Sequence, residues 1–148
     1  MRREEHERLS DSVRSALELA GLGRAQWVSI GQEAPGFGDC AVTFRLGQLI
    51  FRVVRDRGEL FVDLAAAGRP GPFLQYDDVE IAMGWRSIEE VLAKKAPETL
   101  DRVFERIHAG LSQLDTAFSD EQVLLTEAKV RRAAQARGAA FVASLGQD

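Results

Sequence analysis

The sequence predicts an α+β fold in which an N-terminal helix precedes a three- to four-stranded antiparallel meander, and C-terminal helices then pack on one sheet face. Three patterns support this prediction. Apolar residues recur at helical spacing before residue 21, alternate with polar or small residues between 40 and 64, and return to helical spacing after residue 76. No internal repeat interrupts this order, so we expect one domain over residues 1–148.

The first helix is predicted from an apolar stripe that ends at Gly21 and Gly23, with acidic residues near its start where the helix dipole favours them. A short β-prone stretch follows at 27–30, and then a loop at 31–38 that contains Pro35 and three glycines. We therefore expect a helix, a short strand and a loop, with this helical stripe buried: Leu9, Val13, Ala16, Leu17 and Ala20.

The meander is predicted from period-two alternation in three segments. The first is 40–46, the second is 49–54, and the third contains Leu60, Val62 and Leu64, with Phe61 and Asp63 on the opposite face. The turn at 55–58, Arg-Asp-Arg-Gly, separates the second segment from the third. We expect Asp63 to pair across the strands with one of the turn arginines, Arg55 or Arg57.

Four helices are predicted after residue 76. Asp77 or Asp78 is expected to cap a short helix that runs to Met83, and Ser87 with Glu90 forms a capping-box pattern for the next. Residues 98–118 carry the clearest stripe, and Ser119 with Gln122 offers a capping box for a final helix. The apolar side of that helix is thin, so we expect 119–148 to pack loosely or against a partner.

Composition sets limits on location and partners. The chain of 148 residues has a net charge of −4, which opposes broad electrostatic binding to nucleic acid. The one cysteine, Cys40, has no partner for an internal disulfide, which favours a reducing compartment. Neither a signal peptide nor an apolar run long enough to span a membrane is evident. We expect a cytoplasmic protein that does not bind membranes.

Residue types that often take part in catalysis are present, but they lack the neighbouring residues that a catalytic motif needs. The glycines of 31–38 are not followed by Gly-Lys-Ser/Thr and lead into a strand, so we expect an ordinary loop. Cys40 would be a nucleophile only if His108 met it, and it lies on the apolar face of a predicted strand. Asp56, Asp63 and the acids of 77–80 are explained as turn, strand and cap residues. We predict no enzyme, cofactor or metal site.

The acidic charge is concentrated between residues 76 and 101, where seven acidic residues stand against three basic ones. This difference equals the net charge of the chain, and aromatic groups that suit an interface core lie nearby. The alternative is a solvated helix face made of caps and exposed charges. The sequence predicts partner binding by Tyr76, Asp77, Asp78, Glu80, Trp85, Glu89 and Glu90. The basic group on the last predicted helix lacks interleaved aromatic residues and is interpreted as a solvated face.

The segment 51–64 resembles a pattern found in small bacterial proteins. In these, an Arg-Asp-Arg-Gly turn joins two strands, the second strand carries Val-Asp, here Val62 and Asp63, and a Tyr-Asp helix start follows, here Tyr76 and Asp77. Such proteins are similar to the immunity proteins of polymorphic toxin systems. The match covers about the middle third of the chain.

This resemblance implies a binding protein that neutralises a basic toxin by covering its active site, and the acidic segment would speed that encounter. A second interpretation is a cytoplasmic secretion chaperone for an effector protein. A small enzyme is a third possibility that no group of residues supports. The oligomeric state and the activity of the partner cannot be predicted from the sequence.

Overall fold

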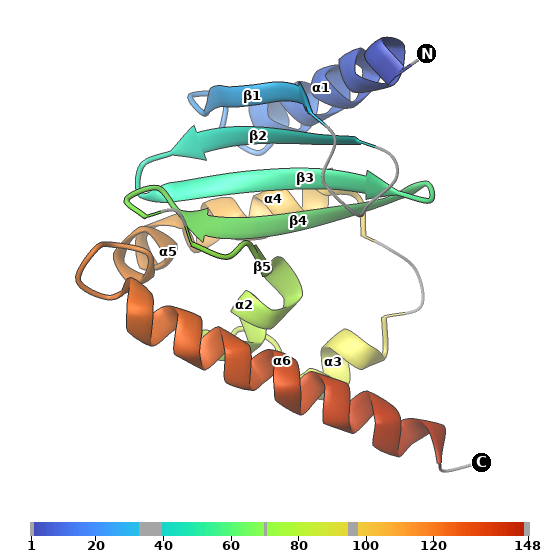
Figure 1. Ribbon diagram of the computed structural model, residues 1–148, viewed down its shortest axis with the longest axis vertical. Coiled ribbons are helices and arrows are strands. Elements are labelled where there is room, and N and C mark those ends of the chain that lie inside the picture. Colours follow the sequence, from blue (N-terminus) through green and yellow to red (C-terminus); the bar gives the residue numbers. More distant parts are fainter. Residues whose placement is uncertain (1, 33–39, 70, 95–97, 147–148) are drawn as a thin grey trace.

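The computed structural model describes residues 2–32, 40–69, 71–94 and 98–146, which form a mixed α+β fold (Figure 1). The antiparallel sheet has five strands in the order β1-β2-β3-β4-β5. The predicted fold class is confirmed. The elements are α1 (Arg2–Leu19), β1 (Gln26–Gln32), β2 (Cys40–Leu46), β3 (Leu49–Asp56), β4 (Glu59–Ala66), β5 (Leu74–Gln75), α2 (Tyr76–Ala82), α3 (Ile88–Leu92), α4 (Leu100–Ala109), α5 (Leu111–Ala117) and α6 (Val123–Leu145).

The sheet has more strands than the three or four predicted. The extra strand, β5, has only two residues and pairs with β4 at Asp63 and Leu64. A strand this short shows no alternation, so its sequence carries no signal of it. The β3–β4 turn is tight because Arg57 and Gly58 both adopt positive φ angles, 55° and 82°. These angles are typical of a two-residue type I′ hairpin, which fixes the register of β3 on β4.

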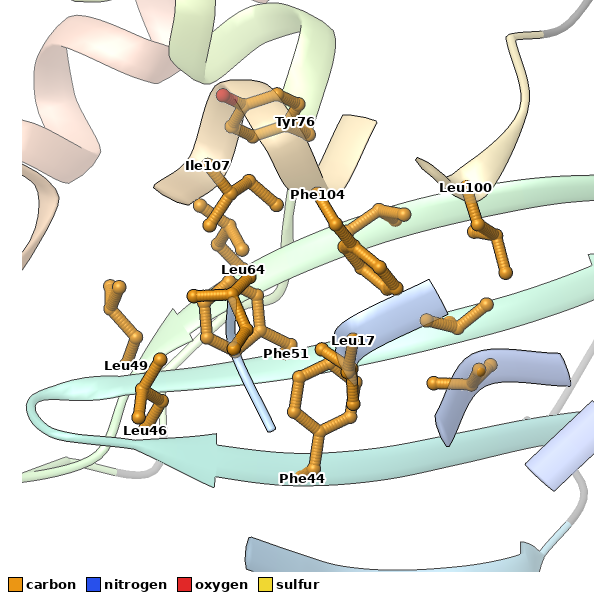
Figure 2. Close-up of a cluster of buried hydrophobic side chains, with 14 of the residues drawn as sticks. Leu17, Phe44, Leu46, Leu49, Phe51, Leu64, Tyr76, Leu100, Phe104 and Ile107 are labelled. Atoms are coloured by element: carbon orange, nitrogen blue, oxygen red, sulfur yellow. The ribbon is translucent and has the colours of Figure 1, made fainter. Parts of the chain in front are cut away.

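The hydrophobic core lies on one face of the sheet. The rings of Phe44 in β2 and Phe51 in β3 stack with centroids 5.0 Å apart, and Phe104 of α4 meets Phe44 edge-on at 6.1 Å (Figure 2). Helices α1 and α4 lie on this face, behind the sheet in Figure 1. All five residues of the stripe predicted for the first helix are buried. One buried cluster therefore extends along the chain from Leu9 to Val130.

The single helix predicted over 98–118 is in fact two helices, α4 and α5, with Gly110 between them. A Cβ atom at Gly110 would lie 2.9 Å from Cζ2 of Trp85, so this ring packs directly on the glycine backbone. The helical spacing continues across the break because α5 begins at once. For this reason most of the predicted stripe is buried although the helix is interrupted. Val103 and Leu111 are only partly buried, whereas the other five residues are buried: Leu100, Phe104, Ile107, Leu114 and Phe118.

Of the predicted helix caps, only that of α3 forms. Ser87 Oγ accepts a hydrogen bond from the Glu90 amide at 3.1 Å, and the Glu90 carboxylate accepts one from the Ser87 amide at 3.2 Å. Asp77 and Asp78 were expected as caps of α2, but Gln75 holds the N-cap position and makes no side-chain cap bond. Gln122 likewise begins α6 without a side-chain cap bond.

The last helix, α6, packs on α2 and α3 and lies across the far side of these helices from the sheet (Figure 1). Its residues Val123, Val130 and Ala133 are buried, but Phe141 and Leu145 are 51% and 64% exposed. Helix α6 therefore packs on other helices, and the exposed fractions of Phe141 and Leu145 show that its C-terminal part is largely uncovered. Among the described residues, no helix has the length and apolar character needed to cross a bilayer.

The core predicts a large difference between two phenylalanine substitutions. Phe104→Ala should lower the free energy of unfolding by about 3–5 kcal/mol, because Phe104 is fully buried and its loss leaves a cavity. Phe141→Ala, the same change at an exposed site, should alter it by less than about 0.5 kcal/mol. Chemical denaturation of both variants measures this, and equal losses would contradict the assigned core.

Candidate functional site

The residues predicted to bind a partner do not share one exposed surface. Tyr76, Asp78 and Glu80 are buried, with exposed fractions of 3%, 3% and 1%. Two more, Asp77 and Trp85, are partly buried. Glu89 and Glu90 on α3 are exposed. Whether these residues contact a partner stays a prediction, but only the α3 pair is freely available at the surface.

Glu80 is the centre of an ion-pair network that joins α2, α4 and the segments around α3. Its carboxylate accepts hydrogen bonds from Nε of Arg106 at 2.9 Å and from Nη1 of Arg86 at 3.3 Å. Glu98 binds the same two guanidinium groups, through Nη1 of Arg86 at 3.2 Å and Nη2 of Arg106 at 2.9 Å. A carboxylate removed from water needs such partners, because an unpaired buried charge is strongly destabilising.

The neighbouring acids are also paired within the chain. Asp77 accepts hydrogen bonds from Nζ of Lys94 at 3.0 and 3.3 Å. Asp78 binds Arg137 of α6 through Nε at 2.6 Å and Nη2 at 3.1 Å, which fastens α6 to α2. The acidic excess of 76–101 is therefore offset by arginines from outside this stretch, and its net charge overstates the charge that a partner would meet.

The pKa values of this region follow from the same contacts. The hydrogen bond from Arg106 holds the pKa of Glu98 below its ordinary value of 4.5. Burial, with the negative charge of Glu80 nearby, raises the pKa of Tyr76, so its hydroxyl stays protonated. The Tyr76 hydroxyl is buried and has no hydrogen-bond partner among the described residues.

A groove lies beside this network, between β4 and the helices. Its cavity measures about 330 Å³. Leu60 and Val62 of β4 line it together with Leu100 and Val103 of α4, so much of its lining is apolar. Charged groups of the network also reach it. The remaining lining residues are Glu59, Phe61, Asp63, Gln75, Tyr76, Asp77, Lys94 and Glu98.

The edge of β4 that borders this groove is only partly covered. Strand β5 pairs with Asp63 and Leu64, whereas residues 59–62 have no strand neighbour on that side within the described part of the chain. Strand edges of this kind offer backbone donors and acceptors to another chain. The apolar lining and the open edge together make the groove a candidate binding site for a polypeptide.

The candidate catalytic residues do not assemble. Cys40 begins β2, whereas His108 lines a separate cavity of about 820 Å³ together with Leu46, at the opposite end of that strand. Cys40 is buried, and Nη2 of Arg55 donates to its sulfur at 3.6 Å. Asp63 pairs across the strands with Arg52 at 3.0 Å, and not with Arg55 or Arg57 of the turn as expected, because the register places Arg52 directly opposite Asp63.

Metal and phosphate sites receive no support from the described residues. Within the ranges that the structure describes, no three His, Cys, Asp or Glu side chains are grouped so that they could hold a metal ion. Most of the glycine-rich loop predicted at 31–38 lies outside the described residues, and its first residue, Gly31, belongs to β1.

Comparison with models of protein families found no match for this chain, and comparisons with curated proteins and with solved structures also found none. The immunity-protein resemblance therefore stays a prediction.

Sequence reasoning did not identify the basic partners of the acidic segment or the groove. Arg106 and Arg137 lie on helices α4 and α6 and are 26 and 59 residues from the acids that they bind. Arginines on a charged helix face give no sign of a buried partner. The groove residues Leu60, Val62, Leu100 and Val103 were expected in strands and helices, but no pattern indicates the space between them.

The lowered pKa of Glu98 predicts a pH-dependent contribution to stability. A carboxylate whose pKa falls on folding stabilises the protein above its unfolded value of 4.5, and this contribution is lost as the pH falls through the folded value. Glu98→Gln should therefore reduce stability at pH 7 and flatten its decline in acid. Thermal unfolding between pH 3 and 7 measures both effects. Glu89→Gln, at an exposed position, should leave the wild-type curve unchanged, and identical slopes for all three proteins would contradict the assignment.

Proposed function

We propose that this chain is a non-catalytic binding protein whose partner is another protein. The observation that supports this proposal most directly is the groove beside the open edge of β4, which combines apolar walls with free backbone groups. Hydrogen bonding along a strand edge is a general way for one protein to hold another. A catalytic role for Cys40 would need a base such as His108 close to its thiol. Cys40 begins β2, whereas His108 of α4 lines a cavity beside Leu46, at the other end of that strand.

The first candidate partner is a toxin, and the protein would then be an immunity protein that covers the toxin's active site. The resemblance of residues 51–64 supports this role, as does the net charge of −4, because many toxins that act on nucleic acid are cationic. The acids available for steering are the exposed Glu89, Glu90 and Asp101. We place the protein in the cytoplasm because the sequence holds one cysteine, Cys40, and so cannot form a disulfide within the chain.

The second candidate is a secretion chaperone that holds a segment of an effector. The open strand edge favours this role specifically, because it suits an extended polypeptide better than the folded surface of a toxin. The two roles differ in what the partner does when this chain is absent: a toxin kills the cell, and an effector is not exported.

Coexpression with the product of the adjacent reading frame tests the proposed function. We expect that product to arrest growth when expressed alone, and growth to return when this chain is present and forms a complex with it. Restored secretion without any toxicity would identify the chaperone role instead. An adjacent product that neither binds this chain nor depends on it would contradict both roles.

Charge reversal at the exposed acids should change the rate of association. Glu89→Lys with Asp101→Lys should slow association on the order of tenfold at low salt and reduce its dependence on salt, because surface charges mainly steer encounter. Asp11→Lys with Glu18→Lys makes the same charge change on α1, which lies at the opposite end of the molecule from α3 in Figure 1, and should have a smaller effect. Stopped-flow kinetics against the identified partner measure both association rates, and equal slowing would mean that only the net charge matters.

Asp78 and Glu80 are unsuitable for this test because they are buried in ion pairs.

A further inference from the structure

From the register of the β3–β4 hairpin we infer that residues 59–62 of β4 accept an extended segment of the partner as an additional strand of the sheet. This inference rests on the proposed function, since it specifies how the partner protein is held. The occupant is a polypeptide in β conformation, with apolar side chains on the face that enters the groove.

The hairpin register shows which backbone groups of β4 are free. The Ala67 amide donates to the Gln48 carbonyl at 2.8 Å, which marks this pair as hydrogen-bonded across β3 and β4. In an antiparallel pair, hydrogen-bonded and non-hydrogen-bonded pairs alternate, so every second residue of β4 bonds to β3. Phe61, opposite Val54, bonds to β3 by this alternation, whereas Leu60 and Val62 direct their amides and carbonyls to the other edge.

Within the described residues, no strand pairs with this part of the edge. The same alternation directs the backbone groups of Leu64 away from β3, where β5 pairs with it through Leu74. Strand β5 then ends, because the chain turns into α2 at Tyr76. The edge formed by residues 59–62 extends roughly 13 Å. The cavity of about 330 Å³ adjoins it, so an added strand would continue the line that β5 begins.

The groove also determines the side chains that fit. An added strand would direct alternate side chains toward Val62 of β4 and toward Leu100 and Val103 of α4, which favours apolar residues at these positions. Its other side chains would lie beside Phe61, which is 44% exposed, on the opposite face. Acidic side chains at the rim, such as Glu59, favour basic residues there. The expected segment alternates apolar with basic or polar residues.

A second copy of this chain is a less suitable occupant. A β4 strand from another copy would bring a second Glu59 to the rim of the groove, where Glu59 of the first copy already lies. Like charges placed opposite each other across strands are destabilising. A partner segment with basic residues avoids this repulsion.

A library of random dodecapeptides displayed on phage, selected on the folded protein, tests the inference. We expect the selected peptides to alternate apolar with basic or polar residues. A synthetic copy of one of them should slow hydrogen exchange at the Leu60 and Val62 amides by at least about tenfold, while the Phe61 amide, already bonded to β3, changes little. Nuclear magnetic resonance of the free and bound protein measures these rates residue by residue.

Two variants and one control variant show whether the peptide occupies the groove. Val103→Arg fills the groove from the side of α4 and should weaken peptide binding by at least about tenfold. Val28→Arg makes the same change at an exposed position on β1 and should leave binding unchanged. Leu60→Pro removes an edge amide while sparing the bonds to β3, so it should also weaken binding. A thermal melt confirms that each variant is folded.

The outcomes separate this inference from the proposed function. Peptides that bind without protecting Leu60 and Val62, or a selection that recovers no alternating peptide, would overturn the inference. A concentration-dependent dimer that protects these amides without peptide would overturn it in favour of a second copy. In each case, a complex with the adjacent gene product would still support the proposed function through another surface. If the peptides bind as expected but the adjacent gene product does not bind, the result supports strand addition at residues 59–62. It would contradict the proposed roles in binding a toxin or an effector encoded by the adjacent gene.

Discussion

The buried carboxylate of Glu80 is the constraint around which the C-terminal half of this protein is arranged. A charge with 1% exposure is tolerable only if cations hold it in place, and Arg86 and Arg106 supply them from two different segments. The pairing of Glu80 with Arg106 holds α4 against α2. Its pairing with Arg86 brings the segment that precedes α3 into the same network. Glu98 completes it by accepting hydrogen bonds from Nη1 of Arg86 and Nη2 of Arg106, which also donate to Glu80. The ionic contacts thus set positions that the apolar core alone leaves open, since α3 contributes only Val91 to the buried apolar residues.

The same contacts account for the groove. Strand β5 leads directly into α2, and the pairing of Asp78 with Arg137 and of Glu80 with Arg106 holds that helix against α6 and α4. Because α2 is fixed in this way, the chain leaves the edge of β4 after two residues, and residues 59–62 are not covered by β5. Asp78 and Glu80, which the sequence assigns to partner binding, therefore also form ion pairs within the chain. They position the walls of the groove, and the groove itself is lined in large part by apolar residues of β4 and α4.

The sequence was sufficient for the elements whose pattern is local. The stripe of α1, the alternation of β2 to β4 and the capping box of α3 are each encoded within a few neighbouring residues, and each is present in the structure. Features that depend on distant residues were missed. The ring of Trp85 packs on the backbone of Gly110, where the helix is interrupted, and the pairing of Asp78 depends on Arg137, which lies 59 residues away. The sequence does not show whether an acidic residue faces solvent or an arginine from another element. The charge excess of 76–101 therefore predicts an acidic surface, although part of it is paired within the chain.

An open strand edge is a liability that proteins ordinarily cover or protect with charge, because it invites pairing with other chains. This chain covers one part of the edge with β5 and surrounds the rest with Glu59, Asp77, Lys94 and Glu98. Extending β5 by a few residues would have closed the edge, but the chain instead turns at once into α2, whose acids are committed to the buried network. Within the described residues, the uncovered length is short and enclosed by charged groups, which opposes indiscriminate pairing. It adjoins a cavity that is lined in part by the apolar residues Leu60, Val62, Leu100 and Val103. Protection at the rim combined with apolar space behind it is what selective recognition of an extended segment requires.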